Sequence, residues 1–192
     1  ADFAYDTLDG NSDLEGESYK DFRDSDAYSA RSPALYVGSN DGMLHAFNGD
    51  DGNELFAYVP AGVIDNLTHL TSPDYGHKYF VDGSPRVGDA YLPTSDSICP
   101  LTGSAANGFC WRTVLLGSTG AGGNSIFALD VTDPDNFDES NVMWEFTHPE
   151  LGTTIGQPTI VRLEKAPYWF AIFGNGYNST SHKAQLFIVE LA

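Results

Sequence analysis

Three short, mainly apolar runs near the start of the chain are separated by polar, glycine-bearing segments. The runs lie at 35–38, 43–47 and 54–59. Short runs of apolar and aromatic residues bounded by turn residues are typical of β-strands. The pair Asp41-Gly42 separates the first two runs and supplies the positive φ that a tight hairpin turn needs. Pro60 closes the third run, because proline cannot donate to a strand ladder. The pattern predicts an antiparallel meander over residues 33–60.

Two further groups of strand signals follow, one over residues 79–147 and one over residues 155–192. The individual signals lie at 79–83, 85–92, 111–116 and 125–131, around Trp144, and at 155–161, 169–173 and 184–191. The last group has fewer strand signals than the group before it. We therefore expect it to be a truncated unit whose final strand pairs with further chain, so that the whole belongs to a longer polypeptide.

The segment between the first two groups has apolar residues at helical spacing. Val63, Leu67 and Leu70 recur three to four residues apart, behind Pro60. Proline is favoured at the start of a helix, so residues 61–78 are predicted to be a connector that contains one short helix.

An internal repeat links the first two groups. Ala128-x-Asp130 repeats Ala46-x-Asn48, and an aromatic residue follows each, Phe56 in the first group and Trp144 in the second. Repetition of one meander unit is typical of a β-propeller. The predicted fold class is all-β: a partial, quinoprotein-like β-propeller of about two and a half blades, with a short connecting helix and long loops. Because natural propellers use about four to eight blades, these blades cannot close a ring alone.

The first unit also resembles the docking signature of quinoprotein propeller blades, Ala-x-Asp-x-x-Thr-Gly-x-x-x-Trp. The Asp, Thr and Trp of that signature are replaced by Asn48, Asp51 and Phe56. The replacements can still cap a turn and fill a gap between blades. The resemblance therefore supports the architecture more strongly than it supports kinship with quinoprotein enzymes.

Charge narrows the range of partners. The chain has 9 Lys and Arg against 27 Asp and Glu, a formal net charge of −18. Nucleic acid and anionic membranes both need clusters of basic side chains, so neither is an expected partner. No apolar run approaches the length of a membrane span, so no membrane insertion is expected. Residues 1–31 hold nine acidic and three basic side chains without a sustained period, which predicts an extended, solvated lead-in over 1–32.

Residues 93–109 are predicted to be an insertion, and Cys99 and Cys110 close a short loop at its end. A disulfide between Cys99 and Cys110 is the preferred interpretation, and it would imply an oxidising compartment. Closure of so short a loop would stabilise the fold by roughly 2–3 kcal/mol. A pair of free thiols is the alternative, and a zinc site is disfavoured because no further ligands lie at the required spacing.

Candidate chemistry elsewhere is sparse. The acidic turn at residues 132–141 offers Asp133, Asp135 and Asp138 as calcium candidates, although an exposed turn accounts for them adequately. No histidine lies beside a nucleophile at a spacing that local geometry would convert into a catalytic site, so no catalytic residue is predicted. His45 alternates with apolar neighbours in a strand, which favours a packing role or a hydrogen bond between blades.

Several motifs, in this order and spacing, resemble the PilY/PilC family. They are YVGSNDGMLHAF at 36–47, HKYFVDG at 77–83, WRTVL at 111–115, GAGG at 120–123 and ALDVTDP at 128–134. The resemblance covers residues 31–191 and implies part of the family's carboxy-terminal modified β-propeller.

The resemblance implies a non-enzymatic role in pilus assembly, retraction control and surface adhesion. It also implies export through the periplasm to the outer cell surface at the tip of a type IV pilus. The implied partners are minor pilins or the pilus tip, a host or abiotic surface, and the remainder of the propeller itself. Calcium, which the family often binds in a propeller loop, is expected outside these residues. The alternatives are a fragment of a quinoprotein dehydrogenase that uses pyrroloquinoline quinone, and an extracellular scaffold. The first commonly carries a vicinal cysteine pair, which this sequence lacks.

Overall fold

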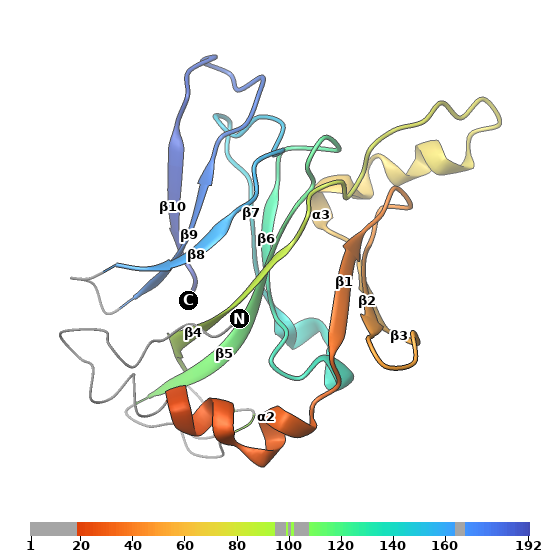
Figure 1. The fold of residues 1–192 in the computed structure, drawn as a ribbon. Helices are drawn as coiled ribbons and strands as arrows, with labels where there is room; N and C mark the ends of the chain where they lie inside the picture. Colours follow the sequence, from red (N-terminus) through yellow and green to blue (C-terminus); the bar gives the residue numbers. More distant parts are fainter. Residues whose placement is uncertain (1–18, 95–98, 100, 102–107, 164–167) are drawn as a thin grey trace.

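Three antiparallel sheets make up most of the structure, a computed structural model that describes residues 19–94, 99, 101, 108–163 and 168–192. The first sheet has the order β1-β2-β3 and contains β1 (Ala34–Gly38), β2 (Leu44–Asn48) and β3 (Glu54–Tyr58). The second has the order β4-β5-β6-β7 and contains β4 (Arg86–Pro93), β5 (Phe109–Ser118), β6 (Ile126–Asp130) and β7 (Val142–Phe146). The third has the order β10-β9-β8 and contains β8 (Thr159–Arg162), β9 (Trp169–Gly174) and β10 (Leu186–Glu190). Figure 1 shows the three sheets side by side along the molecule. The all-β prediction is confirmed.

Helices are few and short. They are α2 (Asp26–Ala30), α3 (Ala61–Ile64), and the 3-10 turns η2 (Leu67–Thr71), η3 (Pro134–Asn136) and η4 (Glu139–Asn141). The predicted connector helix corresponds to α3 and η2, where Val63 is fully buried and Leu70 is exposed. No helix in the described ranges is both long enough and apolar enough to cross a membrane.

The turn between β1 and β2 needs its glycine. Gly42 has φ +98, a backbone conformation that L side chains rarely adopt, and a Cβ there would lie 2.2 Å from Leu67 Cδ2. Both the positive φ of Gly42 and the close packing of Leu67 from η2 therefore require glycine in the predicted hairpin turn.

The internal repeat is present in the backbone as well as in the sequence. Ala46 lies opposite Phe56 across β2 and β3, and Ala128 lies opposite Trp144 across β6 and β7. In both pairs the register shifts immediately after the alanine. The first sheet is therefore built like strands β5, β6 and β7 of the second.

Two clusters of buried apolar side chains lie between the sheets. One cluster lies between the first and second sheets, with Leu44, Leu115 and Phe127 all fully buried. The other joins the second and third sheets through residues such as Leu116 and Trp169. The strands therefore pack on one another mainly through apolar side chains.

The expected extended, solvated lead-in is wrong for residues 19–30. Residues 19–24 are helical, α2 follows, and Tyr19 and Phe22 belong to the cluster between the second and third sheets. Phe22 is 1% exposed and its ring stacks on Trp111 at 6.4 Å between centroids. The acidic residues of this segment stay exposed, so a short amphipathic pattern is hidden within a strongly charged stretch. Residues 1–18 lie outside the described residues.

The segment at 79–83, predicted to begin a strand, is not one, and β4 begins only at Arg86. Its backbone instead crosses the ends of two strands: Val81 N donates to Ser39 O at 3.2 Å and Asp82 N donates to Thr119 O at 3.3 Å. Phe80 and Val81 are buried there, which explains their apolar character without a strand.

Candidate functional site

The predicted disulfide is present. Cys99 and Cys110 are bonded, with 5.5 Å between their Cα atoms and a sequence separation of 11. Cys110 lies on β5 opposite Leu92 of β4, so the bond fastens the insertion to the open end of this strand pair. Both cysteines are buried. The parts of the insertion at 95–98, 100 and 102–107 lie outside the described residues.

The three calcium candidates have separate partners in their own turn or next to it. Asp133 accepts from Asn136 Nδ2 at 2.9 Å, Asp135 accepts from Ser32 N at 3.2 Å, and Asp138 accepts from Ser140 N at 2.8 Å. The hydrogen bonds from Ser140 hold the pKa of Asp138 below its usual value. Across the part of the chain that the structure describes, no group of three or more His, Cys, Asp or Glu side chains is placed to hold a metal ion. The structure therefore does not bring these carboxylates together.

His45 bridges two carboxylates of its own sheet. Its Nδ1 lies 2.5 Å from Glu54 Oε1 and its Nε2 lies 2.8 Å from Asp41 Oδ2. The hydrogen bond to Glu54, followed by that to Asp41, raises the pKa of His45. The expected hydrogen bond between blades is wrong for these partners, because Asp41 in the β1–β2 turn and Glu54 on β3 belong to the same meander as His45.

The altered docking signature performs the roles expected of it. Asn48 Oδ1 accepts from Asp50 N at 2.8 Å and Asp51 Oδ1 accepts from Asn53 N at 2.9 Å, so both residues order the turn. Phe56 stacks on Phe137, with 3.8 Å between ring centroids and an angle of 9°. Since Phe137 lies in the acidic turn of the second unit, the ring fills the gap between units, as predicted.

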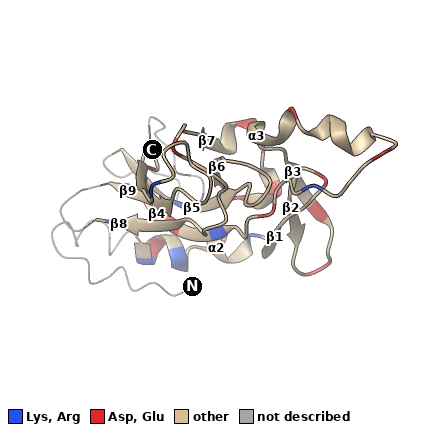
Figure 2. Cartoon of the chain, turned by 90° about the horizontal axis from the view of Figure 1, so that it is seen from above, with Lys and Arg blue, Asp and Glu red and all other residues tan. Residues whose placement is uncertain are grey.

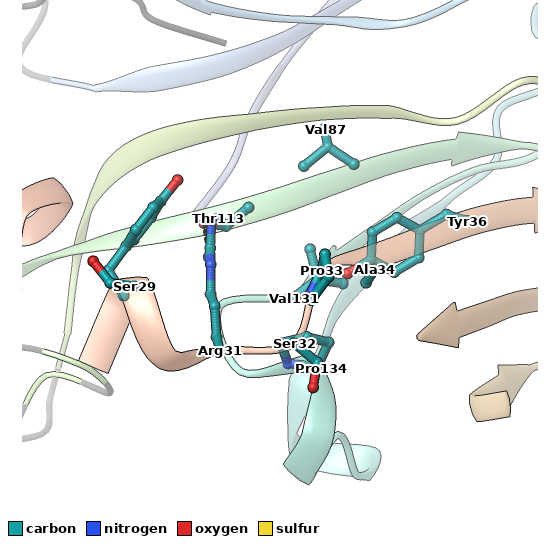
Figure 3. Close-up of a pocket in the computed structure, with 11 residues that line it drawn as sticks. Ser29, Arg31, Ser32, Pro33, Ala34, Tyr36, Val87, Thr113, Val131 and Pro134 are labelled. Atoms are coloured by element: carbon teal, nitrogen blue, oxygen red, sulfur yellow. Dashed lines mark hydrogen bonds between the residues drawn. The ribbon is translucent and has the colours of Figure 1, made fainter. Parts of the chain in front are cut away.

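A cavity of about 460 Å³ lies between the first two sheets. Figure 3 shows it bounded by Arg31 and Ser32, which follow α2, by Tyr36 on β1, by Thr113 on β5 and by Val87 on β4. Burial raises the pKa of Tyr36 to about 12, so its hydroxyl stays protonated at neutral pH. The cavity offers hydroxyl groups, an aromatic wall and one guanidinium.

Arg31 is fixed at the edge of this cavity. Its Nη1 donates to Thr113 Oγ1 at 2.9 Å and to Thr132 O at 3.4 Å, and its guanidinium carbon lies 3.7 Å from the centre of the Tyr28 ring. Cation–π contact and charge-assisted hydrogen bonds hold the side chain in one orientation. The segment that enters β1 is thereby fastened to the second sheet.

A buried carboxylate lies behind Arg31. Asp89 is 6% exposed; it accepts from Thr113 Oγ1 at 2.7 Å and from Tyr19 Oη at 3.0 Å, and Arg23 Nη1 lies 3.7 Å away. Burial, together with the charge of Asp89, raises the pKa of Tyr19, which remains a donor. The network joins the helical segment to the second sheet and leaves this buried charge paired.

Sequence reasoning missed the cavity and this network. The charge pattern assigns Arg31 to a solvated segment, whereas its partners lie 82 and 101 positions away in the sequence. One local signal exists: Asp89 is the only charged residue in the otherwise apolar run 87–92.

Figure 2 shows Lys and Arg around α2 and β4, while Asp and Glu are spread over the turns of the first sheet and its connector. The cavity residues include no paired nucleophile and general base, and their arrangement suits packing or binding.

Comparison with known proteins identifies the family to which this architecture belongs. Residues 12–192 match the family model described as the PilY1 beta-propeller domain. The chain is 47% identical over 195 residues to a type IV pilus biogenesis factor PilY1 homolog of Xylella fastidiosa, an alignment that covers 100% of this chain and 12% of that protein. It is 42% identical over 173 residues to the type IV pilus biogenesis factor PilY1 of Pseudomonas aeruginosa, covering 87% of this chain and 13% of that protein.

The fold is similar to a solved structure as well. The crystal structure of the Pseudomonas aeruginosa PilY1 C-terminal domain matches with a TM-score of 0.65 and 40% identity, over 90% of this chain and 30% of that chain. The predicted partial β-propeller is therefore confirmed. The chain spans only 12% to 13% of the length of these curated relatives. With a family model matched over residues 12–192, the chain belongs to the PilY1 beta-propeller family.

Proposed function

We propose that this chain is part of the propeller of a type IV pilus-associated protein that acts by binding rather than by catalysis. The protein supports pilus assembly, controls retraction and contributes to surface adhesion from the pilus tip. One observation carries the proposal: relatives that are 42% to 47% identical over most of the chain are named type IV pilus biogenesis factors. Its partners are minor pilins, a host or abiotic surface, and the rest of its own propeller.

Features of the chain support a binding role outside the cell. The disulfide between Cys99 and Cys110 suits an exported protein, because disulfides persist in oxidising compartments. The net charge of −18 favours a solvated surface. Phe56 fills an interblade gap, and within the cavity the Thr113 hydroxyl and the Arg31 guanidinium have partners within the protein.

The test is a deletion in a bacterium that carries the protein. Removing residues 19–192 should abolish surface pili and twitching movement, and the purified protein should lose co-purifying minor pilins. A matched strain with Leu70→Ala, a change at an exposed connector position, should keep both properties. Normal piliation in the deletion strain would overturn the proposal.

A quinoprotein dehydrogenase is the second candidate, favoured by the likeness of residues 46–56 to the docking signature. It predicts that the purified full-length protein shows the absorbance of a bound quinone and reduces an artificial electron acceptor when an alcohol is supplied. If both signals are seen, the binding proposal fails and the enzyme is established.

A further inference from the structure

The connector between the first two sheets carries exposed aromatic side chains on an arm of the molecule. In Figures 1 and 2, α3, η2 and the loop after them extend away from the sheets before the chain returns toward β4. On this return path Tyr75 is 41% exposed and Tyr79 is 50% exposed. We call residues 75–79 the aromatic loop.

Local contacts fix both tyrosine rings of the aromatic loop. Tyr75 N donates to Ser72 O at 3.2 Å, and its side-chain Oη accepts from Lys78 N at 3.2 Å. The Tyr79 ring meets the His77 ring edge-on, with 5.0 Å between centroids and an angle of 87°. Since each ring is already held, a ligand that stacks on it costs little conformational entropy.

The base of the aromatic loop is anchored to the first hairpin. Asn40, in the β1–β2 turn, accepts from Phe80 N at 3.2 Å through its Oδ1, and its Nδ2 lies 3.2 Å from His77 Nε2. Phe80 itself is 1% exposed. One amide side chain thus holds the loop on both sides of Tyr79. The exposure of the Tyr79 ring is therefore a property of the folded loop.

Polar groups beside the rings keep hydrogen-bonding capacity. Within the described residues, neither the ammonium of Lys78 nor the hydroxyl of Tyr79 has a hydrogen-bond partner. The hydroxyl of Tyr75 accepts from Lys78 N and can still donate. Lys78 is also the only Lys or Arg in residues 32–85. The aromatic loop therefore offers two exposed rings next to one ammonium and two phenol donors.

We propose that the aromatic loop binds a neutral saccharide. The C–H face of a sugar ring stacks on the electron-rich face of a tyrosine, and sugar hydroxyl groups accept from ammonium and phenol donors. The net charge of −18 disfavours a polyanionic ligand. A protein partner needs about 800 Å² per side around an apolar centre, far more than two half-exposed rings supply. The inference rests on the adhesion part of the proposed function and gives it a ligand class.

An array of immobilised oligosaccharides tests the ligand class with the full-length protein. The wild-type protein should bind at least one oligosaccharide that ends in glucose, galactose, mannose or N-acetylglucosamine. Tyr79→Ala should weaken that binding by about tenfold or more, whereas Tyr79→Phe keeps the ring and should keep the binding. Tyr177→Ala, at a 69% exposed tyrosine of the β9–β10 hairpin, is the control and should bind normally.

Several results of the array would overturn the proposal. They are the absence of binding to any neutral oligosaccharide, binding to acidic oligosaccharides alone, and unchanged binding by Tyr79→Ala. Equal losses in Tyr79→Ala and Tyr177→Ala would overturn it as well, because the effect would then not depend on the aromatic loop.

Acylation of lysines locates the site without any substitution. With the bound oligosaccharide present, an amine-acylating reagent should modify Lys78 severalfold more slowly, as measured by mass spectrometry of the digest. Lys183, exposed in the β9–β10 hairpin, is the control and should react at an unchanged rate. Unchanged acylation of Lys78 would contradict the proposal.

The saccharide site and the proposed function fail in different measurements. Pili and twitching movement after deletion of residues 19–192 test the proposed function, whereas the array and the acylation use purified protein. A strain with Tyr79→Ala should keep its pili and attach less to a surface coated with the bound oligosaccharide. Unchanged attachment of that strain would overturn the role of the aromatic loop in adhesion.

Discussion

At the scale of single residues, the bridge from His45 to Glu54 and Asp41 predicts a pH-dependent contribution to stability. The pKa of His45 is raised by its hydrogen bond to Glu54 and then by that to Asp41. Partial burial opposes ionisation of Asp41, but its hydrogen bond to His45 holds its pKa below the usual value. Because the folded pKa of His45 lies above its unfolded value of about 6.5, the stabilisation is fully present below that pH. It is lost as the pH rises through the folded pKa.

His45→Gln should therefore lower the free energy of unfolding most at about pH 5.5 and least at about pH 9. Since the carboxylates of Asp41 and Glu54 are 44% and 47% exposed, we expect a difference of about 1 kcal/mol or less. Urea unfolding of the propeller domain at both pH values measures it. His69→Gln, at an exposed position, is the control. A destabilisation by His45→Gln that grows as the pH rises would contradict the expected direction.

Phe22 provides a second prediction at the residue scale. The side chain is 1% exposed and contacts Trp111 and Tyr28. Phe22→Ala should lower the free energy of unfolding by about 3–5 kcal/mol, because it leaves a cavity between the helical segment and the second sheet. Leu70→Ala, at an exposed position, should change stability by about 0.5 kcal/mol at most. Urea unfolding compares the two variants. Equal effects of the two substitutions would show that residues 19–24 do not pack as described.

At the scale of elements, Glu145 of β7 joins the first unit to the second. Both of its carboxylate oxygens lie 2.9 Å from Ala61 N at the start of α3, and the hydroxyl of Tyr58 on β3 donates to Oε1. Burial, and then the hydrogen bond to Glu145, raises the pKa of Tyr58, so the phenol remains a donor. One carboxylate thus orients the connector where it leaves the first sheet.

Glu145→Ala should lower the free energy of unfolding by about 1–2 kcal/mol, because it removes the acceptor for two donors. It should also speed hydrogen exchange at Ala61. Glu139→Ala, in the exposed η4 turn, is the matched control and should leave both measurements near the wild-type values. Unchanged exchange at Ala61 in Glu145→Ala would show that the carboxylate does not hold the connector.

At the scale of the whole molecule, the third sheet presents an unpartnered apolar face at its edge. Leu186 and Ile188 of β10 are 66% and 53% exposed, while Phe187 and Val189 between and after them pack on the core. Strand β10 is an edge strand of its sheet. Exposed apolar edges favour association, and in a propeller the next blade covers such a face.

The isolated 192-residue chain should therefore self-associate and bind dyes that report exposed apolar surface. Leu186→Lys combined with Ile188→Lys should reduce both effects, whereas Tyr177→Lys in the exposed β9–β10 hairpin should not. Light scattering and dye fluorescence measure these effects. A monodisperse wild-type chain without dye binding would contradict the expectation, while the full propeller should show neither effect.

The amino-acid sequence by itself determined the strands, the turns between them and the repeat. The strand β1 is predicted at 35–38 and is found at Ala34–Gly38, because a short β-prone run and the Asp41-Gly42 turn that follows it are local properties of the chain. The disulfide was also predictable, since two cysteines bracket one short insertion. The spacing of Ala46 and Phe56, repeated at Ala128 and Trp144, was enough to identify blades.

Only the tertiary structure decided how distant segments meet. Tyr19 and Asp89 are 70 positions apart, and Arg31 and Thr113 are 82 apart. Their contacts depend on how the sheets pack, which no local period encodes. The same reason explains why 79–83 resembled a strand: Phe80 and Val81 are apolar because they are buried across strand ends, and burial alone does not specify a ladder. The cavity between the first two sheets likewise exists only because two sheets from different parts of the chain face each other.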